Sequence, residues 1–199
     1  MEPTSLDFRA FAFIITLAAV INGLGIVRWL TALSEYLRRR RSVDIQHYWV
    51  FSLLAAYQFL LHILMWWTMW NVHAASFNFL TYLYLLTGPV LLFLGTSMLT
   101  PSFEADGDDI RSHFSAVRPI YSTVLVLLWL WAIFTGPVLL GFLAPTAPLL
   151  ALFLTTAVAL RATGNPKVHG IVVVLNWLLV VAFVALYAMQ LGGIATQAE

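Results

Sequence analysis

Six apolar runs, five of them long, are the feature that most constrains this chain of 199 residues. A helix needs roughly 20 mostly apolar residues to cross a hydrocarbon core about 30 Å thick. Backbone groups cannot stay unpaired in lipid, and these runs lack the alternation typical of membrane strands. The sequence therefore predicts an all-α, polytopic transmembrane helix bundle, a single domain over 1–199 with six spanning helices. The predicted spans are residues 11–30, 48–70, 79–99, 121–143, 147–160 and 171–191.

Basic residues are distributed unevenly among the connections between these runs. Cytoplasmic loops collect Lys and Arg, so the first, third and fifth connections are predicted to be cytoplasmic and both the N-terminus and the C-terminus outside. The run 147–160 is short, and a re-entrant or interfacial segment is the alternative to a crossing. A crossing is favoured because it keeps the basic residues of the fifth connection inside. Of the ten Lys and Arg, only Arg9 departs from this pattern; the others are Arg28, Arg38, Arg39, Arg40, Arg41, Arg111, Arg118, Arg161 and Lys167.

Composition excludes several classes of chemistry. Hydrophobic residues make up 61% of the chain and charged residues 10%, whereas a soluble domain carries about 25% charged residues. The absence of cysteine excludes disulfides, thiolate metal sites and cysteine nucleophiles. Nucleotide-binding, zinc-protease and hydrolase motifs are absent as well. We therefore predict no catalytic residue, no cofactor and no nucleic-acid partner. The expected partners are the lipid bilayer and further copies of this chain or other membrane proteins.

Polar residues inside the runs form a small set without Asp or Glu. Counted from the predicted cytoplasmic ends, several of them lie at nearly one depth, and Gln58 and His62 share a helix face because they are four residues apart. Two interpretations remain open: the set lines a small polar cavity, or each member ties neighbouring helices together. Both require Gln58 and His62 to face the bundle interior, since polar groups are costly in hydrocarbon. The candidate cluster is Asn22, Gln58, His62, Thr87 and Asn176.

One hexapeptide, Thr-Gly-Pro-Val-Leu-Leu, occurs in both the third and the fourth run. A proline inside a helix frees the carbonyl four residues earlier and kinks the helix. A neighbouring glycine allows another helix to approach closely. The repeat therefore predicts two kinked, closely packed helices, with kinks at Gly88, Pro89, Gly136 and Pro137.

Two further groups of residues have alternative interpretations. Trp129 and Trp131 lie near the middle of the fourth run, where helix packing is favoured over a wall for an apolar or aromatic ligand. His47 and His169 both lie near the predicted cytoplasmic interface, at the starts of the second and sixth runs. They form the histidine pair at matching depth that a membrane haem requires, although interfacial histidines are ordinary. No other metal site is predicted.

Several segments of the first two thirds of the chain carry a resemblance. They are residues 28–41, 47–49, 62–67 and 89–101, together with His113, Phe114 and Arg118. In these segments the chain resembles an uncharacterised family of small bacterial six-helix integral membrane proteins. The resemblance implies a multi-pass protein of the bacterial cytoplasmic (inner) membrane, and it implies no activity and no site residue.

Three function classes follow from these observations. The first is a binding or accessory/assembly protein that acts through helix contacts, which the lack of catalytic groups favours. The second is a passive channel or uniporter for a small neutral or apolar solute, which rests on the polar set and the prolines. The third is a haem-binding membrane protein. A water-filled cavity at the midplane, reached from one side, would favour the second, and bound pigment would indicate the third.

Overall fold

The computed structural model describes residues 5–39, 48–73, 75–100 and 110–189, with the side chains of residues 5–10 outside this description. Within these residues the regular structure is entirely helical, which confirms the all-α part of the predicted fold class for the described part of the chain. The α-helices are α1 (Ser5–Arg39), α2 (Trp49–Thr68), α3 (Phe79–Leu99), α4 (Ile110–Thr135), α5 (Ala147–Ala162) and α6 (Pro166–Phe183). Short helical turns extend three of them: η1 (Met69–Val72) after α2, η2 (Gly136–Leu140) after α4 and η3 (Val184–Ala188) after α6.

Five of these helices are long and apolar enough to cross a membrane: α1, α2, α3, α4 and α6, with α2, α4 and α6 counted together with their helical extensions. The remaining helix, α5, is apolar but has 16 residues, which corresponds to about 24 Å of helix. Large hydrophobic side chains cover the outside of the bundle, for example Phe13, Leu80 and Leu178. A surface this apolar is typical of contact with lipid rather than water.

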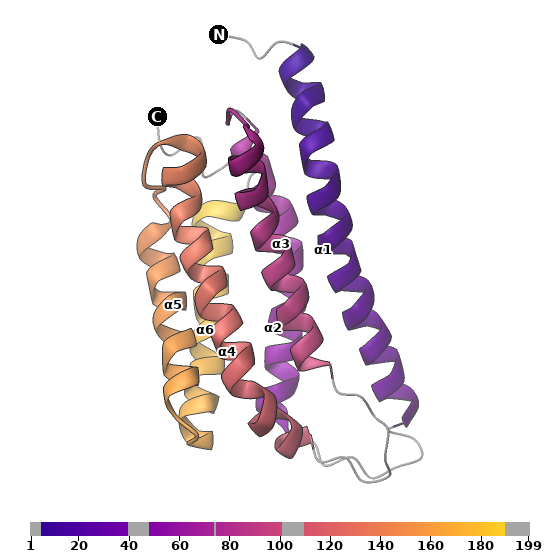
Figure 1. Ribbon diagram of the computed structural model, residues 1–199. Helices are drawn as coiled ribbons and strands as arrows, with labels where there is room; N and C mark the ends of the chain where they lie inside the picture. The colour runs from indigo at the N-terminus through magenta and orange to yellow at the C-terminus, as the bar shows by residue number, and fades with distance from the viewer. Residues whose placement is uncertain (1–4, 40–47, 74, 101–109, 190–199) are drawn as a thin grey trace.

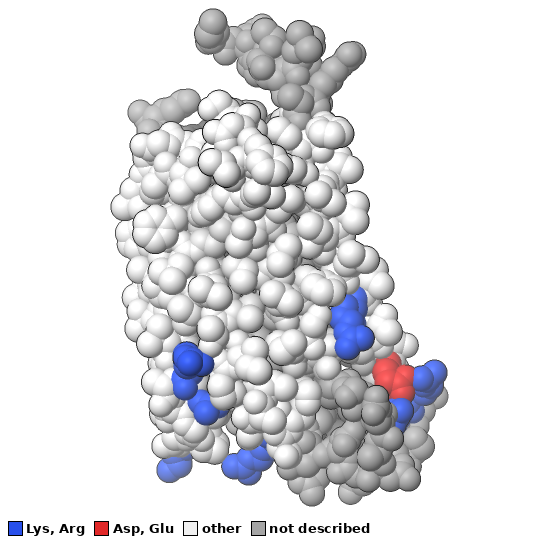
Figure 2. Space-filling model, in the orientation of Figure 1, with Lys and Arg blue, Asp and Glu red and all other residues white. Residues whose placement is uncertain are grey.

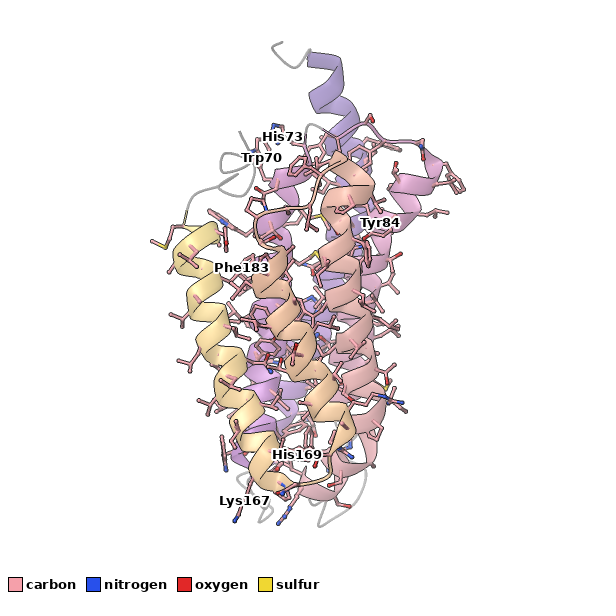
Figure 3. The ribbon with its side chains drawn as sticks, turned by 90° about the vertical axis from the view of Figure 1, so that its left-hand side faces the viewer. Trp70, His73, Tyr84, Lys167, His169 and Phe183 are labelled. Carbon is pink, nitrogen blue, oxygen red and sulfur yellow. The ribbon has the colours of Figure 1, made fainter. Side chains whose placement is uncertain are left out.

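Consecutive helices run in opposite directions (Figure 1). The two ends of the bundle differ in their basic residues. The Lys and Arg side chains visible in Figure 2 all lie toward the end where α1 ends and α4 begins. We call this the charged end, and the opposite end, where α2 ends and α3 begins, the neutral end. Figure 3 shows Lys167 and His169 at the charged end and Trp70 and His73 at the neutral end.

The short helix α5 extends between the same two ends as its neighbours. At the charged end, the Arg118 guanidinium on α4 donates to the carbonyls of Leu160 (2.8 Å) and Thr163, at and just after the end of α5. At the neutral end, the Tyr187 hydroxyl after α6 donates to the Pro145 carbonyl just before α5 (3.2 Å). The two contacts place one end of α5 beside Arg118 of α4 and the other beside Tyr187 of η3.

The central helix of the bundle is α2, which contacts α1, α3, α4 and α6. Its side chains Leu54, Tyr57, Gln58 and His62 are almost completely buried. Polar groups carried by α2 are therefore surrounded by other helices, and this position explains why its Gln and His residues find partners on three neighbours.

Helix boundaries differ from the predicted spans where a helix is amphipathic. The fourth span was predicted over 121–143, but α4 begins at Ile110 and its extension η2 ends at Leu140. The additional residues bury Ile110 and Phe114 and expose Arg111 and Ser115. Apolar residues four positions apart are typical of a surface helix with one buried face. A search for continuous apolar runs does not detect such a segment.

The two repeated Gly-Pro pairs have different local structures. α3 is one continuous α-helix through Pro89. The α-helical part of α4 ends at Thr135, and Pro137 lies in the π-helical turn η2, which Gly141 terminates with a φ of 79°. A departure from α-helical geometry is thus present at the second proline, where the missing N–H group removes a helical hydrogen bond.

Candidate functional site

His62 lies at the centre of a hydrogen-bonded group that joins α1, α2 and α3. Its Nδ1 is 2.8 Å from Asn22 Oδ1, and its Nε2 is 2.8 Å from Thr96 Oγ1. The Asn22 amide also donates from Nδ2 to the His62 carbonyl (3.1 Å), which turns its oxygen toward the ring. This arrangement assigns the proton to Nδ1 and makes Nε2 the acceptor of the Thr96 hydroxyl. The imidazole is fully buried and hydrogen-bonded at both nitrogens.

Gln58 forms the second polar group, one helical turn nearer the charged end. Its Nε2 donates to the Leu92 carbonyl of α3 (3.0 Å), and its Oε1 accepts the Tyr121 hydroxyl of α4 (3.2 Å). Gln58 and His62 are both 0% exposed, which confirms the prediction that they face the bundle interior.

Glycines bring the neighbouring helices into contact with these polar side chains. A Cβ atom added to Gly25 would lie 2.2 Å from Cε1 of His62, and one added to Gly95 would lie 3.0 Å from Nε2 of Gln58. No room remains for a solute beside either group. Neither of the two cavities described below is lined by Asn22, Gln58 or His62. The geometry therefore favours helix ties over a polar cavity.

Two members of the predicted cluster do not join it. Thr87 is exposed, and its hydroxyl donates to the Leu83 carbonyl of its own helix (3.1 Å). Asn176 is buried, but its Oδ1 accepts the Thr156 hydroxyl (2.8 Å) in a separate tie between α5 and α6. The residue of α3 that completes the group is Thr96, which the sequence analysis did not single out.

A difference in helix register explains the error at Thr87. Depth was counted from the ends of the apolar runs, as if these ends were level. Arg28 of α1 donates from Nε to the hydroxyl of Thr100 at the end of α3 (3.1 Å). Since α1 continues to Arg39, the end of α3 lies well inside the length of α1. Residues near the end of α3, such as Thr96, are therefore the ones level with His62.

The histidine pair considered for haem is only partly described. His47 lies outside the described residues. His169 Nε2 is 2.8 Å from the Thr163 carbonyl, and its ring packs edge-on against Phe114 (5.6 Å between ring centroids). His169 therefore fastens the start of α6 to the end of α5 through the nitrogen that a haem iron would need.

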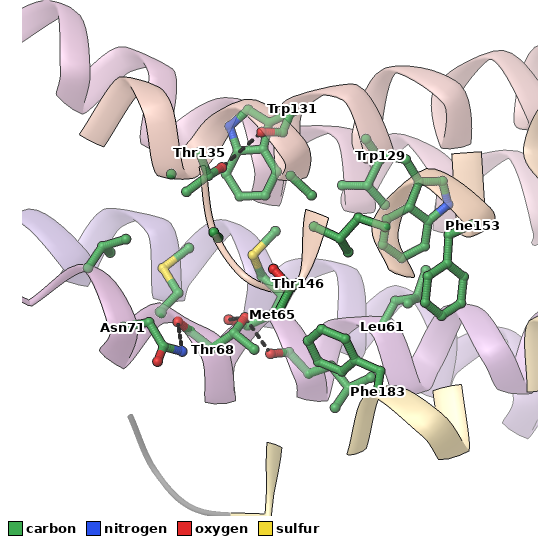
Figure 4. Close-up of a pocket in the computed structure, with 18 of the residues that line it drawn as sticks. Leu61, Met65, Thr68, Asn71, Trp129, Trp131, Thr135, Thr146, Phe153 and Phe183 are labelled. Atoms are coloured by element: carbon green, nitrogen blue, oxygen red, sulfur yellow. Dashed lines mark hydrogen bonds between the residues drawn. The ribbon is translucent and has the colours of Figure 1, made fainter. Parts of the chain in front are cut away.

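A cavity of about 150 Å³ lies between α2, α3, α4, α5 and α6 in the half of the bundle toward the neutral end (Figure 4). Its walls are apolar and rich in aromatic rings. They include Leu61, Leu85, Leu128, Trp129, Trp131 and Phe153. Its polar lining residues lie at the neutral ends of their helices, where they form a rim: Thr68, Asn71, Thr135 and Thr146.

The two tryptophans of α4 form opposite parts of this wall. Trp129 stacks on Phe153 of α5, with ring centroids 4.5 Å apart and an interplanar angle of 18°. The Trp131 indole N–H donates to the Tyr84 carbonyl (2.8 Å), and its ring lies against Gly88, where a Cβ would come within 2.4 Å of Cη2. Trp129 is therefore packed against α5 and Trp131 against α3. A cavity lies beside both tryptophans, as the interpretation of a ligand wall requires.

A second cavity of about 190 Å³ lies beside the charged half of α1 and is lined by Trp29, Tyr36, Phe51 and Thr100, among others. The neighbouring segments 40–47 and 101–109 are outside the described residues, so no site is assigned to it.

Comparisons with protein-family models, with curated proteins and with solved structures found no match to this chain.

Proposed function

We propose that this protein binds a small, uncharged, apolar molecule in the cavity lined by α2, α3, α4, α5 and α6. We also propose that it is a membrane protein of six spans. The observation that carries the proposal is the cavity itself, about 150 Å³ with walls from Leu61, Trp129, Trp131 and Phe153. Apolar cavities of roughly this size stay dry and admit a molecule such as benzene. The protein is then a small-molecule binding protein, which differs from the class expected to act through helix contacts alone.

The chemistry of the lining supports an uncharged ligand. No Lys, Arg, Asp or Glu is present among the described residues that line the cavity. An ion would lose its hydration there without gaining a partner, which is prohibitively costly. A flat ring, by contrast, gains contact with the stacked pair Trp129 and Phe153, and aromatic pairs contribute about 0.5–1.5 kcal/mol beyond area burial.

The cavity is closed toward the charged end, which favours binding of a ligand over passage of a solute through the bundle. Below the cavity, Leu54, Tyr57, Gln58 and Tyr121 are fully buried in contact with other helices. Gln58 and Tyr121 are hydrogen-bonded to each other across that level. A solute in the cavity would have to break these contacts to continue, so a passive channel is the weaker proposal.

The membrane topology forms part of the same proposal. With the charged end in the cytoplasm, both termini lie outside and the cavity lies in the outer half of the membrane. The position of α5 between both ends of the bundle supports a sixth crossing, with local thinning of the bilayer accommodating its 16 residues. The resemblance noted above points to a bacterial cytoplasmic membrane.

Binding of 1-ethyl-4-fluorobenzene to the protein in lipid nanodiscs tests the proposed ligand class. Fluorine NMR would report saturable binding above the partitioning seen in empty nanodiscs. Ala132→Phe places a ring inside the cavity and should abolish the saturable part, whereas Ala151→Phe, on the exposed face of α5, should leave it unchanged. Equal signals from empty and protein-containing nanodiscs would refute the proposal.

A further inference from the structure

One polar group at the rim of the cavity has no hydrogen-bond partner among the described residues. Thr146 immediately precedes α5, is 3% exposed and lines the cavity. Its hydroxyl makes no hydrogen bond and does not cap the helix. The hydroxyls of Thr68 and Thr135 on the same rim instead donate to carbonyls of their own helices, at 2.9 Å each.

The backbone at Thr146 explains why its side chain does not cap α5. A capping residue has an extended backbone, so that its side-chain oxygen reaches the free N–H groups of the first turn. Asn78 and Asn165 have this conformation and accept first-turn N–H groups of α3 and α6. Thr146 is helical, with φ −73° and ψ −16°. Its hydroxyl points into the cavity on the side of Trp131 (Figure 4).

The turn that carries Thr146 is held on both sides. Gly136 lets the turn fold back against α4, because a Cβ at this position would lie 2.6 Å from the Phe142 carbonyl oxygen. The Tyr187 hydroxyl holds the Pro145 carbonyl from the other side (3.2 Å). The backbone of Thr146 is therefore held in place before any ligand arrives, which lowers the cost of binding.

A hydroxyl that faces an apolar cavity without a protein partner is free to bond a ligand, and a ligand oxygen at this point would supply the missing hydrogen bond. The start of α5 also carries partial positive charge, which favours an electron-rich atom nearby. We infer that the ligand is a small ring compound with one uncharged oxygen function, a hydroxyl, ketone or ether. Its oxygen hydrogen-bonds Thr146, and its apolar ring fills the space beside Trp129 and Phe153. The inference rests on the proposed function and specifies its ligand.

Two probes of equal size separate the hydrogen bond from apolar filling. 4-Fluorobenzyl alcohol and 1-ethyl-4-fluorobenzene differ only in a hydroxyl in place of a methyl group. Each affinity is measured by fluorine NMR in nanodiscs and corrected for partitioning into empty nanodiscs. In Thr146→Val, which keeps the shape and removes the hydroxyl, affinity for the alcohol should fall about two- to tenfold, the range of one neutral hydrogen bond. Affinity for the ethyl compound should stay the same.

Control variants distinguish this result from a general loss of structure. Thr146→Ser keeps the hydroxyl and should keep the preference for the alcohol. Thr155→Val removes an exposed hydroxyl from the same helix, one that donates to the Ala151 carbonyl, and should change neither affinity. If Thr146→Val does not fold, Thr146→Ala is compared with Thr146→Ser in the same way.

The outcomes distinguish a failure of the hydrogen bond to Thr146 from a failure of ligand binding in the apolar cavity. If the ethyl compound binds wild type and Ala132→Phe blocks it, but the Val and Ser variants show the same ratio of affinities, the role of Thr146 is wrong and the apolar site stands. If neither probe binds wild type above partitioning, the proposed function itself is wrong. If the ratio of alcohol affinity to ethyl-compound affinity falls in Thr146→Val and not in Thr146→Ser, both the role of Thr146 and the proposed function are supported.

Discussion

Tyr84 and Trp131 exchange hydrogen bonds across the interface between α3 and α4. The Tyr84 hydroxyl donates to the Trp131 carbonyl (2.6 Å), and the Trp131 indole N–H donates to the Tyr84 carbonyl (2.8 Å). The two rings stack with centroids 6.0 Å apart. One turn further along α3, Gly88 leaves the space that the Trp131 ring occupies. We call these contacts between Tyr84 and Trp131 the clasp, and they hold the Trp131 ring at one wall of the cavity.

The clasp predicts that Gly88→Ala is destabilising. The new Cβ would lie 2.4 Å from the rigid indole of Trp131, and overpacking of this kind costs about 1–3 kcal/mol. Gly23→Ala is the matched control, because nothing lies within 4 Å of a Cβ at that position of α1. Unfolding of both variants by denaturant in lipid or detergent measures the difference. Equal stabilities would show that Trp131 does not pack on Gly88.

Removal of the Tyr84 hydroxyl tests the other half of the clasp. Tyr84→Phe keeps the stacked ring and leaves the Trp131 carbonyl with one donor fewer. The expected loss is about 0.5–1.5 kcal/mol, the net value of one hydrogen bond. Tyr82→Phe, at a partly buried tyrosine of the same helix, serves as the comparison. A loss no larger than that of Tyr82→Phe would contradict the assigned bond.

Replacement of His62 by Leu should lower stability without changing ligand binding. The substitution removes the partners of Asn22 and Thr96 inside the bundle, and such interhelical ties in membranes contribute about 0.5–2 kcal/mol. Thr87→Val should have little effect, since that hydroxyl bonds only its own helix. Unfolding measurements and the fluorine NMR assay are made on the same samples. Loss of probe binding at unchanged stability would place the site at His62 instead.

The proposed topology predicts where reporters fused within the chain become active. Fusions after residue 164 and at the C-terminus should report opposite sides, the first cytoplasmic and the second outside, and a fusion after residue 144 should report outside. If α5 does not cross, the fusions after residues 144 and 164 report the same side. A pair of reporters, one active only in the cytoplasm and one only outside, gives a positive signal in every case.

Sequence reasoning recovered what depends on local composition. Apolar runs predicted the helices, and the cost of a polar group in lipid predicted that Gln58 and His62 face inward. The partners of these residues depend on how far one helix slides along another, and apolar runs carry no information on register. Thr96 was therefore missed, and Thr87 was chosen in its place.

The cavity was missed for a related reason. Trp129 and Trp131 differ from packing residues only by what the helices beside them leave empty, and five helices together determine that space. The sequence also held no signal for the role of Thr146. A threonine directly before a helix normally predicts a cap, and only the backbone angles show that its hydroxyl is not used for one.

Diffraction from crystals soaked with 1-bromo-4-ethylbenzene tests the central claim, that the cavity binds a small apolar ring, most directly. The bromine atom gives an anomalous signal that locates the molecule independently of the protein. We predict a single strong peak inside the cavity, between the rings of Trp131 and Phe153, and its loss in Ala132→Phe. Peaks confined to the lipid-facing surface, with an empty cavity in wild type, would contradict the claim.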